Sequence, residues 1–211
     1  MGRLIRTSHC SPSEKEEYLD NLSRLHNVLF TIMESNGDSD NKAAAKNETP
    51  APNVHLSKHP VLSHKITLMR STSTDTGTFR SLLREVTYHL GYEATAHMTT
   101  REIPVTVKIG KEKTEEHLDA MGVKLKEQVA LVPILRSGLG MCDSMLELLP
   151  KSSVYHIGMY RIPGHAPVQY FNRLPKDCQS DIAYLLDPVI ASASTVMAVI
   201  AILKKVRWFD S

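Results

Sequence analysis

Two arginines and one acidic, hydroxyl-rich loop are the residues of this chain best suited to bind an anion. Arg136 lies where an apolar run meets a glycine-rich turn, and Arg161 ends a second apolar run. A third run ends at Asp187 and continues through small residues to Thr195. A long cation beside apolar residues is poorly accommodated unless it reaches an anion. The pattern indicates a phosphate site, although a surface salt bridge of Arg136 is an open alternative.

The segment 187–195 leads directly into a predicted helix. Free backbone N–H groups and the helix dipole at such an N-terminus favour a bound phosphate. Three hydroxyls can add donors, those of Ser192, Ser194 and Thr195. Asp187 is suited to hold a ribose hydroxyl or a metal-bound water. The alternative left open is that Ser194 or Thr195 only caps the helix, while Asp187 closes a turn with Pro188.

Apolar strands that alternate with helices must position these residues. Strand-like patterns occupy residues 101–109, 128–135, 154–162 and 182–186. Helical patterns occupy residues 78–89, 141–149 and 193–206. This alternation is typical of an α/β fold in which a parallel sheet carries helices on both faces. Ligands of such sheets bind at the carboxyl ends of the strands, where the two arginines and the acidic loop lie.

Residues 1–53 are predicted to form an extension before a main domain at 54–211. The sequence Ser11-Pro12-Ser13-Glu14 is typical of a helix start. Five apolar residues then share one helical stripe over about 12–34, namely Tyr18, Leu22, Leu25, Leu29 and Ile32. This helix either docks on the main domain or forms a short coiled coil. Residues 35–53 carry no side chain larger and more apolar than alanine or proline, which predicts a disordered linker.

The overall composition is that of an ordinary globular protein, with 211 residues, 25 Lys and Arg against 23 Asp and Glu, and 42% hydrophobic residues. No run of Lys and Arg exceeds two residues, which argues against nucleic-acid binding. The longest apolar run, residues 196–203, is far shorter than the roughly 20 residues of a membrane-spanning helix. Three scattered cysteines, Cys10, Cys142 and Cys178, suit a reducing compartment, so the cytoplasm is the expected location.

Several motifs resemble the uracil phosphoribosyltransferase family. The resemblance is carried by residues 132–141 (VPILRSGLGM), 158–161 (GMYR), 186–191 (LDPVIA), 92–96 (YEATA) and 58–62 (KHPVL), with Lys65 and Met69-Arg70 after them. These motifs occur in order and at compatible spacing over about residues 54–206, which makes a chance match a poor explanation. The resemblance implies the type I phosphoribosyltransferase fold.

The resemblance also implies an enzyme of pyrimidine salvage. Family members transfer phosphoribosyl from 5-phosphoribosyl 1-diphosphate to uracil, which gives UMP and diphosphate. Arg136 and Arg161 would contact the diphosphate, and Mg²⁺ would bind through that group without a protein metal site. Asp187 would be catalytic. It would also bind the phosphoribosyl group together with Pro188, Val189, Ile190, Ala191, Ser192, Ala193, Ser194 and Thr195.

The same resemblance implies GTP as an allosteric activator and a homodimer or larger homo-oligomer. In that assembly residues 92–96 would lie in the arm through which subunits pair. The alternatives to the enzyme are a non-catalytic protein of this fold that binds or regulates after losing uracil recognition, and a metalloprotein. A metal site would rest on His55, His59 and His64, of which only the first two are four residues apart and which lack Cys or Glu nearby in sequence.

Two departures from the family pattern lead to further expectations. The family has glycines where this chain has Ala193 and Ser194. If either position needs a positive φ, a Cβ there costs on the order of 1 kcal/mol or more. The family also continues with a uracil-binding segment, so we expect this chain to be a C-terminally truncated or alternatively ended form. An edge strand would then be exposed, and three residues would lack full cover, namely Val199, Ile202 and Leu203.

Overall fold

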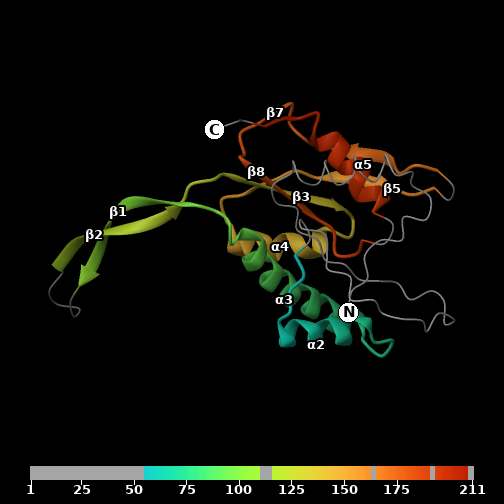
Figure 1. Cartoon of the computed structure of the whole chain (residues 1–211), viewed down its shortest axis with the longest axis horizontal. Coiled ribbons are helices and arrows are strands. Elements are labelled where there is room, and N and C mark those ends of the chain that lie inside the picture. The colour runs from blue at the N-terminus through green and yellow to red at the C-terminus, as the bar shows by residue number, and fades with distance from the viewer. Residues whose placement is uncertain (1–54, 110–115, 163–164, 191–192, 209–211) are drawn as a thin grey trace.

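The computed structural model describes residues 55–109, 116–162, 165–190 and 193–208 (Figure 1). Its helices are α2 (Pro60–Arg70), α3 (Thr76–Thr95), α4 (Leu139–Leu148) and α5 (Ser194–Leu203). Its strands are β1 (Thr100–Ile109), β2 (Glu116–Leu125), β3 (Val129–Leu135), β4 (Ser153–Val154), β5 (Ile157–Tyr160), β6 (Val168–Asn172), β7 (Asp177–Cys178), β8 (Ile182–Leu186) and β9 (Arg207–Trp208). The predicted helix at 12–34 and linker at 35–53 lie outside the described residues and stay predictions.

Strand β3 lies at the centre of a five-stranded sheet. It pairs in parallel with β8 on one side and with β4 and β5 on the other. The predicted parallel sheet is therefore confirmed for β3, β4, β5 and β8. The run at 154–162, expected as a single strand, is divided between β4 and β5. Residues 168–172, where we predicted no strand, form β6, which pairs with β5 in the antiparallel direction.

Both faces of the sheet are covered by helices, as the α/β pattern predicted (Figure 1). Successive side chains of a strand point to opposite faces. Val129 and Leu131 of β3 accordingly belong to a core shared with α3 and α4. Val132 and Ile134 belong to a second core shared with α5. The central strand is thus apolar throughout because each of its faces has its own core.

Helix α5 is more fully covered than the sequence indicated. Val199 is 0% exposed and Leu203 is 2% exposed, while Ile202 is partly buried. The expectation that these residues lack cover is wrong for Val199 and Leu203, because they pack in the core that α5 shares with β3, β5 and β8. Strand β8 does form one edge of the five-stranded sheet within the part of the chain that the structure describes.

Strands β1 and β2 form an antiparallel hairpin that extends away from the main body (Figure 1). Its partners run from Thr100 opposite Leu125 to Ile109 opposite Glu116. The hairpin exposes large apolar side chains, those of Val107, Leu118, Met121, Val123 and Leu125. Residues 92–96, which the resemblance placed in the arm of subunit pairing, end α3 and form its C-cap, and their role in pairing stays a prediction. The projecting segment is the hairpin that follows them.

None of the described helices is long and apolar enough to cross a membrane.

Candidate functional site

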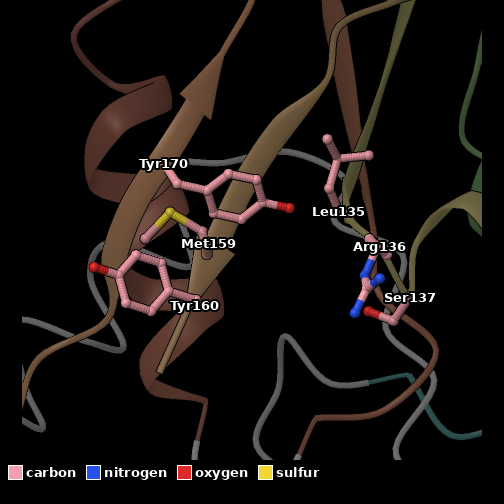
Figure 2. Close-up of a pocket in the computed structure, with 6 residues that line it drawn as sticks. All are labelled: Leu135, Arg136, Ser137, Met159, Tyr160 and Tyr170. Carbon is pink, nitrogen blue, oxygen red and sulfur yellow. The ribbon is translucent and has the colours of Figure 1, made fainter. Parts of the chain in front are cut away.

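A pocket of about 760 Å³ lies at the carboxyl ends of β3 and β5 (Figure 2). Its lining residues are Leu135, Arg136, Ser137, Met159, Tyr160 and Tyr170. The first three follow from the end of β3, the next two end β5, and the last comes from β6. The pocket therefore lies where the strand order predicted a ligand site.

Arg136 brings a guanidinium to this pocket (Figure 2). Its side chain is exposed, and it forms no hydrogen bond or ion pair with another of the described residues. The surface salt bridge that the sequence left open thus has no partner in the described part of the chain. A positive charge at a pocket that forms no ion pair with the described residues is suited to an anionic ligand.

Asp187 connects the acidic loop to the pocket through Ser137. Asp187 follows the last residue of β8 and is 7% exposed. The Ser137 hydroxyl donates a hydrogen bond to Oδ1 of Asp187 at 2.9 Å. Burial raises the pKa of Asp187 above its ordinary value. The hydrogen bonds from Ser137 and from the backbone N–H of Val189 oppose that rise in pKa, as does the charge of Arg161.

Arg161 is held against the start of helix α5. Its Nε donates to Oγ1 of Thr195 at 2.8 Å, across 34 residues of sequence. The N-cap of α5 is Ala193, and it makes no side-chain capping bond. The alternative in which Ser194 or Thr195 caps this helix is therefore wrong. Thr195 instead accepts a hydrogen bond from one of the two arginines that the sequence singled out.

The remaining residues of the 187–195 loop differ in whether their side chains are exposed to a ligand. Pro188 is buried, and the side chains of Ile190 and Ala193 are only 7% and 4% exposed because they belong to the α5 core. These three can reach a ligand only through their main chain. Val189 is 42% exposed. Ser194 begins α5, while Ala191 and Ser192 lie outside the described residues.

Ala193 has a left-handed backbone, with φ of 58° and ψ of −6°. This is the conformation that glycine adopts at little cost, whereas a Cβ costs on the order of 1 kcal/mol. Position 193 therefore has the positive φ at which loss of the family's glycine carries this cost. The chain nevertheless adopts the turn that precedes α5.

The structure adds one pocket residue that sequence reasoning missed and one contact that it did not specify. Tyr170 lines the pocket from β6, a strand that was not predicted. The signal available was the strand-like sequence Val168-Gln169-Tyr170-Phe171, which is rich in aromatic and β-branched residues. The contact of Ser137 with Asp187, 50 residues apart, carries no local sequence signal.

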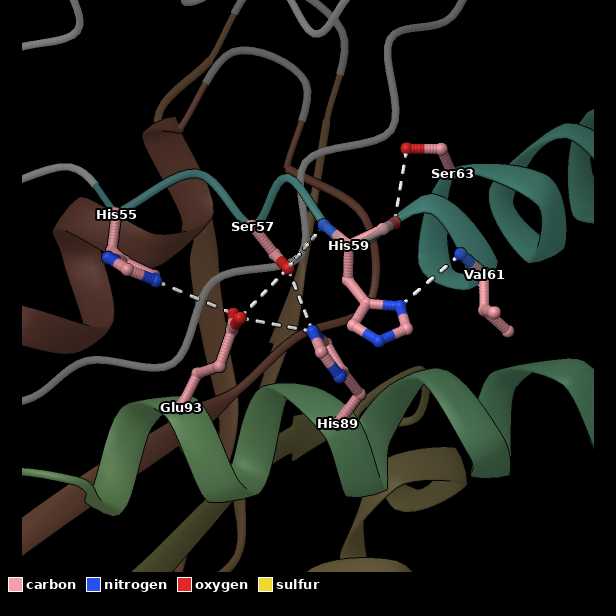
Figure 3. A network of polar contacts seen from close by, with 7 residues as sticks. All are labelled: His55, Ser57, His59, Val61, Ser63, His89 and Glu93. Atoms are coloured by element: carbon pink, nitrogen blue, oxygen red, sulfur yellow. Dashed lines mark hydrogen bonds and ion pairs between the residues drawn. The ribbon is translucent and has the colours of Figure 1, made fainter.

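A second polar cluster lies away from the pocket, between the segment before α2 and helix α3 (Figure 3). The Ser57 hydroxyl donates to Oε1 of Glu93 at 2.9 Å and lies 2.8 Å from Nε2 of His89. Nε2 of His55 lies 3.5 Å from Oε2 of Glu93. Nδ1 of His59 accepts from the backbone N–H of Val61, which caps α2. The cluster fastens the first described residues to α3.

The metalloprotein alternative gains no support from these histidines. His59 is occupied as the cap of α2, and His64 takes no part in the cluster. Across residues 55–109, 116–162, 165–190 and 193–208, no three His, Cys, Asp or Glu side chains are arranged to hold a metal ion.

Comparisons with known proteins agree with this geometry. A family model described as uracil phosphoribosyltransferase matches residues 56–210. A protein named uracil phosphoribosyltransferase from Burkholderia ambifaria (strain MC40-6) is 40% identical over 162 residues, which cover 76% of this chain and 70% of that protein. A protein of the same name from Burkholderia mallei (strain SAVP1) is 42% identical over 160 residues, with the same two shares.

The fold has a counterpart among known structures. The structure of AQ2163 protein from Aquifex aeolicus matches with a TM-score of 0.62 and 30% sequence identity, over 73% of this chain and 71% of that one. The family match covers the whole sheet, the pocket and the loop at Asp187. The chain therefore belongs to the uracil phosphoribosyltransferase family.

Proposed function

We propose that this protein transfers the phosphoribosyl group of 5-phosphoribosyl 1-diphosphate to uracil, with UMP and diphosphate as products. The observation that carries the proposal is the guanidinium of Arg136 in the pocket, which pairs with no side chain in the described part of the chain and lies next to the Ser137 contact with Asp187. The family to which the chain belongs supports uracil as the acceptor. No observation favours a non-catalytic binding protein.

In the proposed reaction N1 of uracil forms a bond to C1 of the ribose, and the bond from C1 to the diphosphate oxygen breaks. The electron pair of that bond leaves with the diphosphate, and the proton of N1 is released to solvent. Negative charge therefore grows on the leaving diphosphate. A fixed cation stabilises that charge more in the transition state than in the bound substrate, which lowers the barrier. Arg136 supplies such a cation, and Arg161 supplies a second one nearby.

Asp187 and the start of α5 would hold the ribose 5-phosphate end. The Asp187 carboxylate accepts a hydrogen bond from Ser137 and can accept another from a ribose hydroxyl. The N-cap residue of α5, Ala193, makes no side-chain capping bond, and the positive end of a helix dipole favours a bound phosphate. Thr195 holds Arg161 at the same helix terminus. No protein nucleophile takes part in this scheme.

Mg²⁺ would enter with the diphosphate of the substrate and offset part of its charge. The observation that supports this route is a carboxylate at the site, that of Asp187. Oxygen ligands of carboxylate and phosphate are those that Mg²⁺ prefers. Activity of the purified chain measured with and without added Mg²⁺ tests this part of the proposal.

A second copy of this chain is the partner that we propose for the β1–β2 hairpin. An isolated two-stranded hairpin is marginally stable in water. This one exposes 64% of Met121 and 70% of Val123. Burial of those side chains against another subunit would stabilise it. Light scattering should give a dimer or larger assembly, and Val123→Lys should shift it toward the monomer while the fold is retained.

Location and regulation are also proposals. Cys142 and Cys178 are free and buried thiols, which is the state kept in a reducing compartment and supports the cytoplasm. Activation by GTP, which the family resemblance implies, stays a prediction. Rates measured over a range of GTP concentrations test it directly.

The central experiment incubates the purified full chain with phosphoribosyl diphosphate, Mg²⁺ and uracil, and measures UMP and diphosphate. Arg136→Gln should lower the rate by about a hundredfold, as expected for loss of one charge-stabilising group. Arg80→Gln on the exposed surface of α3 is the matched control and should leave the rate unchanged. Binding of phosphoribosyl diphosphate without any UMP formation would instead support a non-catalytic protein.

A further inference from the structure

We propose that Tyr170 is a substrate-contacting residue whose hydroxyl donates a hydrogen bond to the diphosphate group held by Arg136. This inference rests on the proposed function, since it assigns a second donor for the same leaving group. Tyr170 lines the same pocket as Arg136 but comes from β6, on the opposite side of β5 from β3. Three independent features of the structure direct its side chain to that pocket.

The first feature is an irregularity in strand pairing. Gly158 of β5 pairs with Phe171 of β6, but the next residue, Met159, pairs with Gln169. Tyr170 therefore has no partner opposite it on β5, as in a β-bulge. A bulge redirects the side chain of the extra residue, and bulges occur often beside active sites. In a regular ladder Tyr170 would lie opposite a residue of β5, and the face of the sheet to which its side chain points would be fixed by the alternation along the strand.

The second feature is the residue beneath the ring. A Cβ added to Gly158 would lie 2.6 Å from Cζ of Tyr170 and 2.8 Å from its Cε2. These distances are too short for any real Cβ, so the ring occupies the space that the missing side chain of Gly158 leaves. The atom closest to that space is the one that carries the hydroxyl. Gly158 thus sets the position of the phenol.

The third feature is the direction of the hydroxyl. Figure 2 shows the Tyr170 hydroxyl pointing toward Leu135 and Arg136, whereas the Tyr160 hydroxyl points away from them. The two rings lie 6.2 Å apart and are tilted by 49°. The Tyr160 ring therefore packs near Tyr170 without directing its own donor to the same place.

The Tyr170 hydroxyl is available as a donor to a ligand in the pocket. The Ser137 hydroxyl already donates to Asp187. The Tyr170 hydroxyl, like the Arg136 guanidinium, forms no hydrogen bond with another residue in the described ranges. A phenol that donates to a charged phosphate oxygen forms a charge-assisted bond, which is stronger than one between neutral groups. An anion bound by Arg136 would give the Tyr170 hydroxyl its partner.

The test measures binding of inorganic diphosphate in the presence of Mg²⁺ by calorimetry, using the full chain. Tyr170→Phe keeps the ring over Gly158 and removes only the hydroxyl. We expect it to weaken diphosphate binding about tenfold, the effect of one hydrogen bond to a charged group. Tyr92→Phe, on a tyrosine of α3 that is 70% exposed, is the matched control and should bind as the unchanged protein does.

Kinetics separate this role from a structural one. Tyr170→Phe should raise KM for phosphoribosyl diphosphate and leave KM for uracil unchanged. A rise in KM for uracil alone would overturn the proposal, because the hydroxyl would then face the base. A melting temperature equal to that of the unchanged protein shows that the fold is retained.

Arg136→Gln distinguishes failure of this inference from failure of the proposed function. If Arg136→Gln weakens diphosphate binding and Tyr170→Phe does not, the role of Tyr170 is wrong and the proposed function stands. If neither the unchanged chain nor any variant binds diphosphate, the proposed function fails and the inference fails with it.

Discussion

Oγ of Ser137 lies 2.9 Å from Oδ1 of Asp187, so the residue after the cation Arg136 is joined to the carboxylate that follows β8. The two residues follow neighbouring parallel strands, β3 and β8. The hydrogen bond holds the pocket and the acidic loop in one arrangement. It also places a buried carboxyl where its protonation affects both stability and function.

Replacement of Asp187 should change how stability depends on pH. Burial raises the pKa of Asp187 in the folded chain above its ordinary value of 3.8. The folded chain then binds this proton more readily than the unfolded chain. The contribution of Asp187 to stability is therefore fully present below pH 3.8 and is lost as the pH rises through the raised pKa. Asp187→Asn should remove that loss, so the variant is more stable than the unchanged protein at neutral pH but has lost its activity.

Urea unfolding at a series of pH values measures this effect. Ser137→Ala is a second variant to measure. It removes a hydrogen bond that lowers the pKa of Asp187, so the loss of stability with rising pH should continue to a higher pH than in the unchanged protein. Equal pH profiles for Asp187→Asn and the unchanged protein would contradict the prediction.

Thr195→Val should loosen Arg161. Valine has the shape of threonine but cannot accept the hydrogen bond that Nε of Arg161 donates at 2.8 Å. Loss of one hydrogen bond to a charged group should raise KM for phosphoribosyl diphosphate by about tenfold. Thr195→Ser keeps the oxygen and should stay close to the unchanged protein. Identical kinetics of the valine and serine variants would show that the contact does not position Arg161 for the substrate.

Ala193→Gly should stabilise the fold. Ala193 has φ of 58°, a conformation in which its Cβ is strained and glycine is not. The free energy of unfolding should rise by about 0.5–1 kcal/mol. Ala198→Gly, within the regular part of α5, is the matched control and should lower it by about 1 kcal/mol. Two variants that change stability in the same direction would refute the role of the left-handed backbone.

Gly138→Ala should destabilise the fold far more than Gly140→Ala. A Cβ at Gly138 would lie 2.2 Å from the carbonyl oxygen of Leu186 and 2.7 Å from the backbone nitrogen of Ile134. Backbone atoms of two paired strands cannot move aside without breaking the sheet, so a cost of at least about 3 kcal/mol is expected. At Gly140 the nearest atom is the flexible end of Leu83, at 2.8 Å, and the cost should stay near about 1 kcal/mol. Thermal unfolding of the two variants provides the comparison.

The sequence by itself determined the α/β class and the location of the candidate site. The apolar run at 129–135 can be buried only between two layers of helices, and a ligand of such a sheet meets the carboxyl ends of its strands. Arg136 and Asp187 follow directly from that pattern, because each ends an apolar strand. These features depend on the periodicity of apolar residues and on residues adjacent in the chain, both of which are local properties of the sequence.

Tertiary structure alone decided which of these residues touch. The contacts of Ser137 with Asp187 and of Arg161 with Thr195 join positions 50 and 34 residues apart. Tyr170 reaches the pocket only because the pairing of β5 with β6 skips it and because Gly158 leaves room. The cover on Val199 likewise comes from strands distant in sequence. Strand register and packing across a sheet are set by long-range contacts, for which no local spacing of residues supplies a signal.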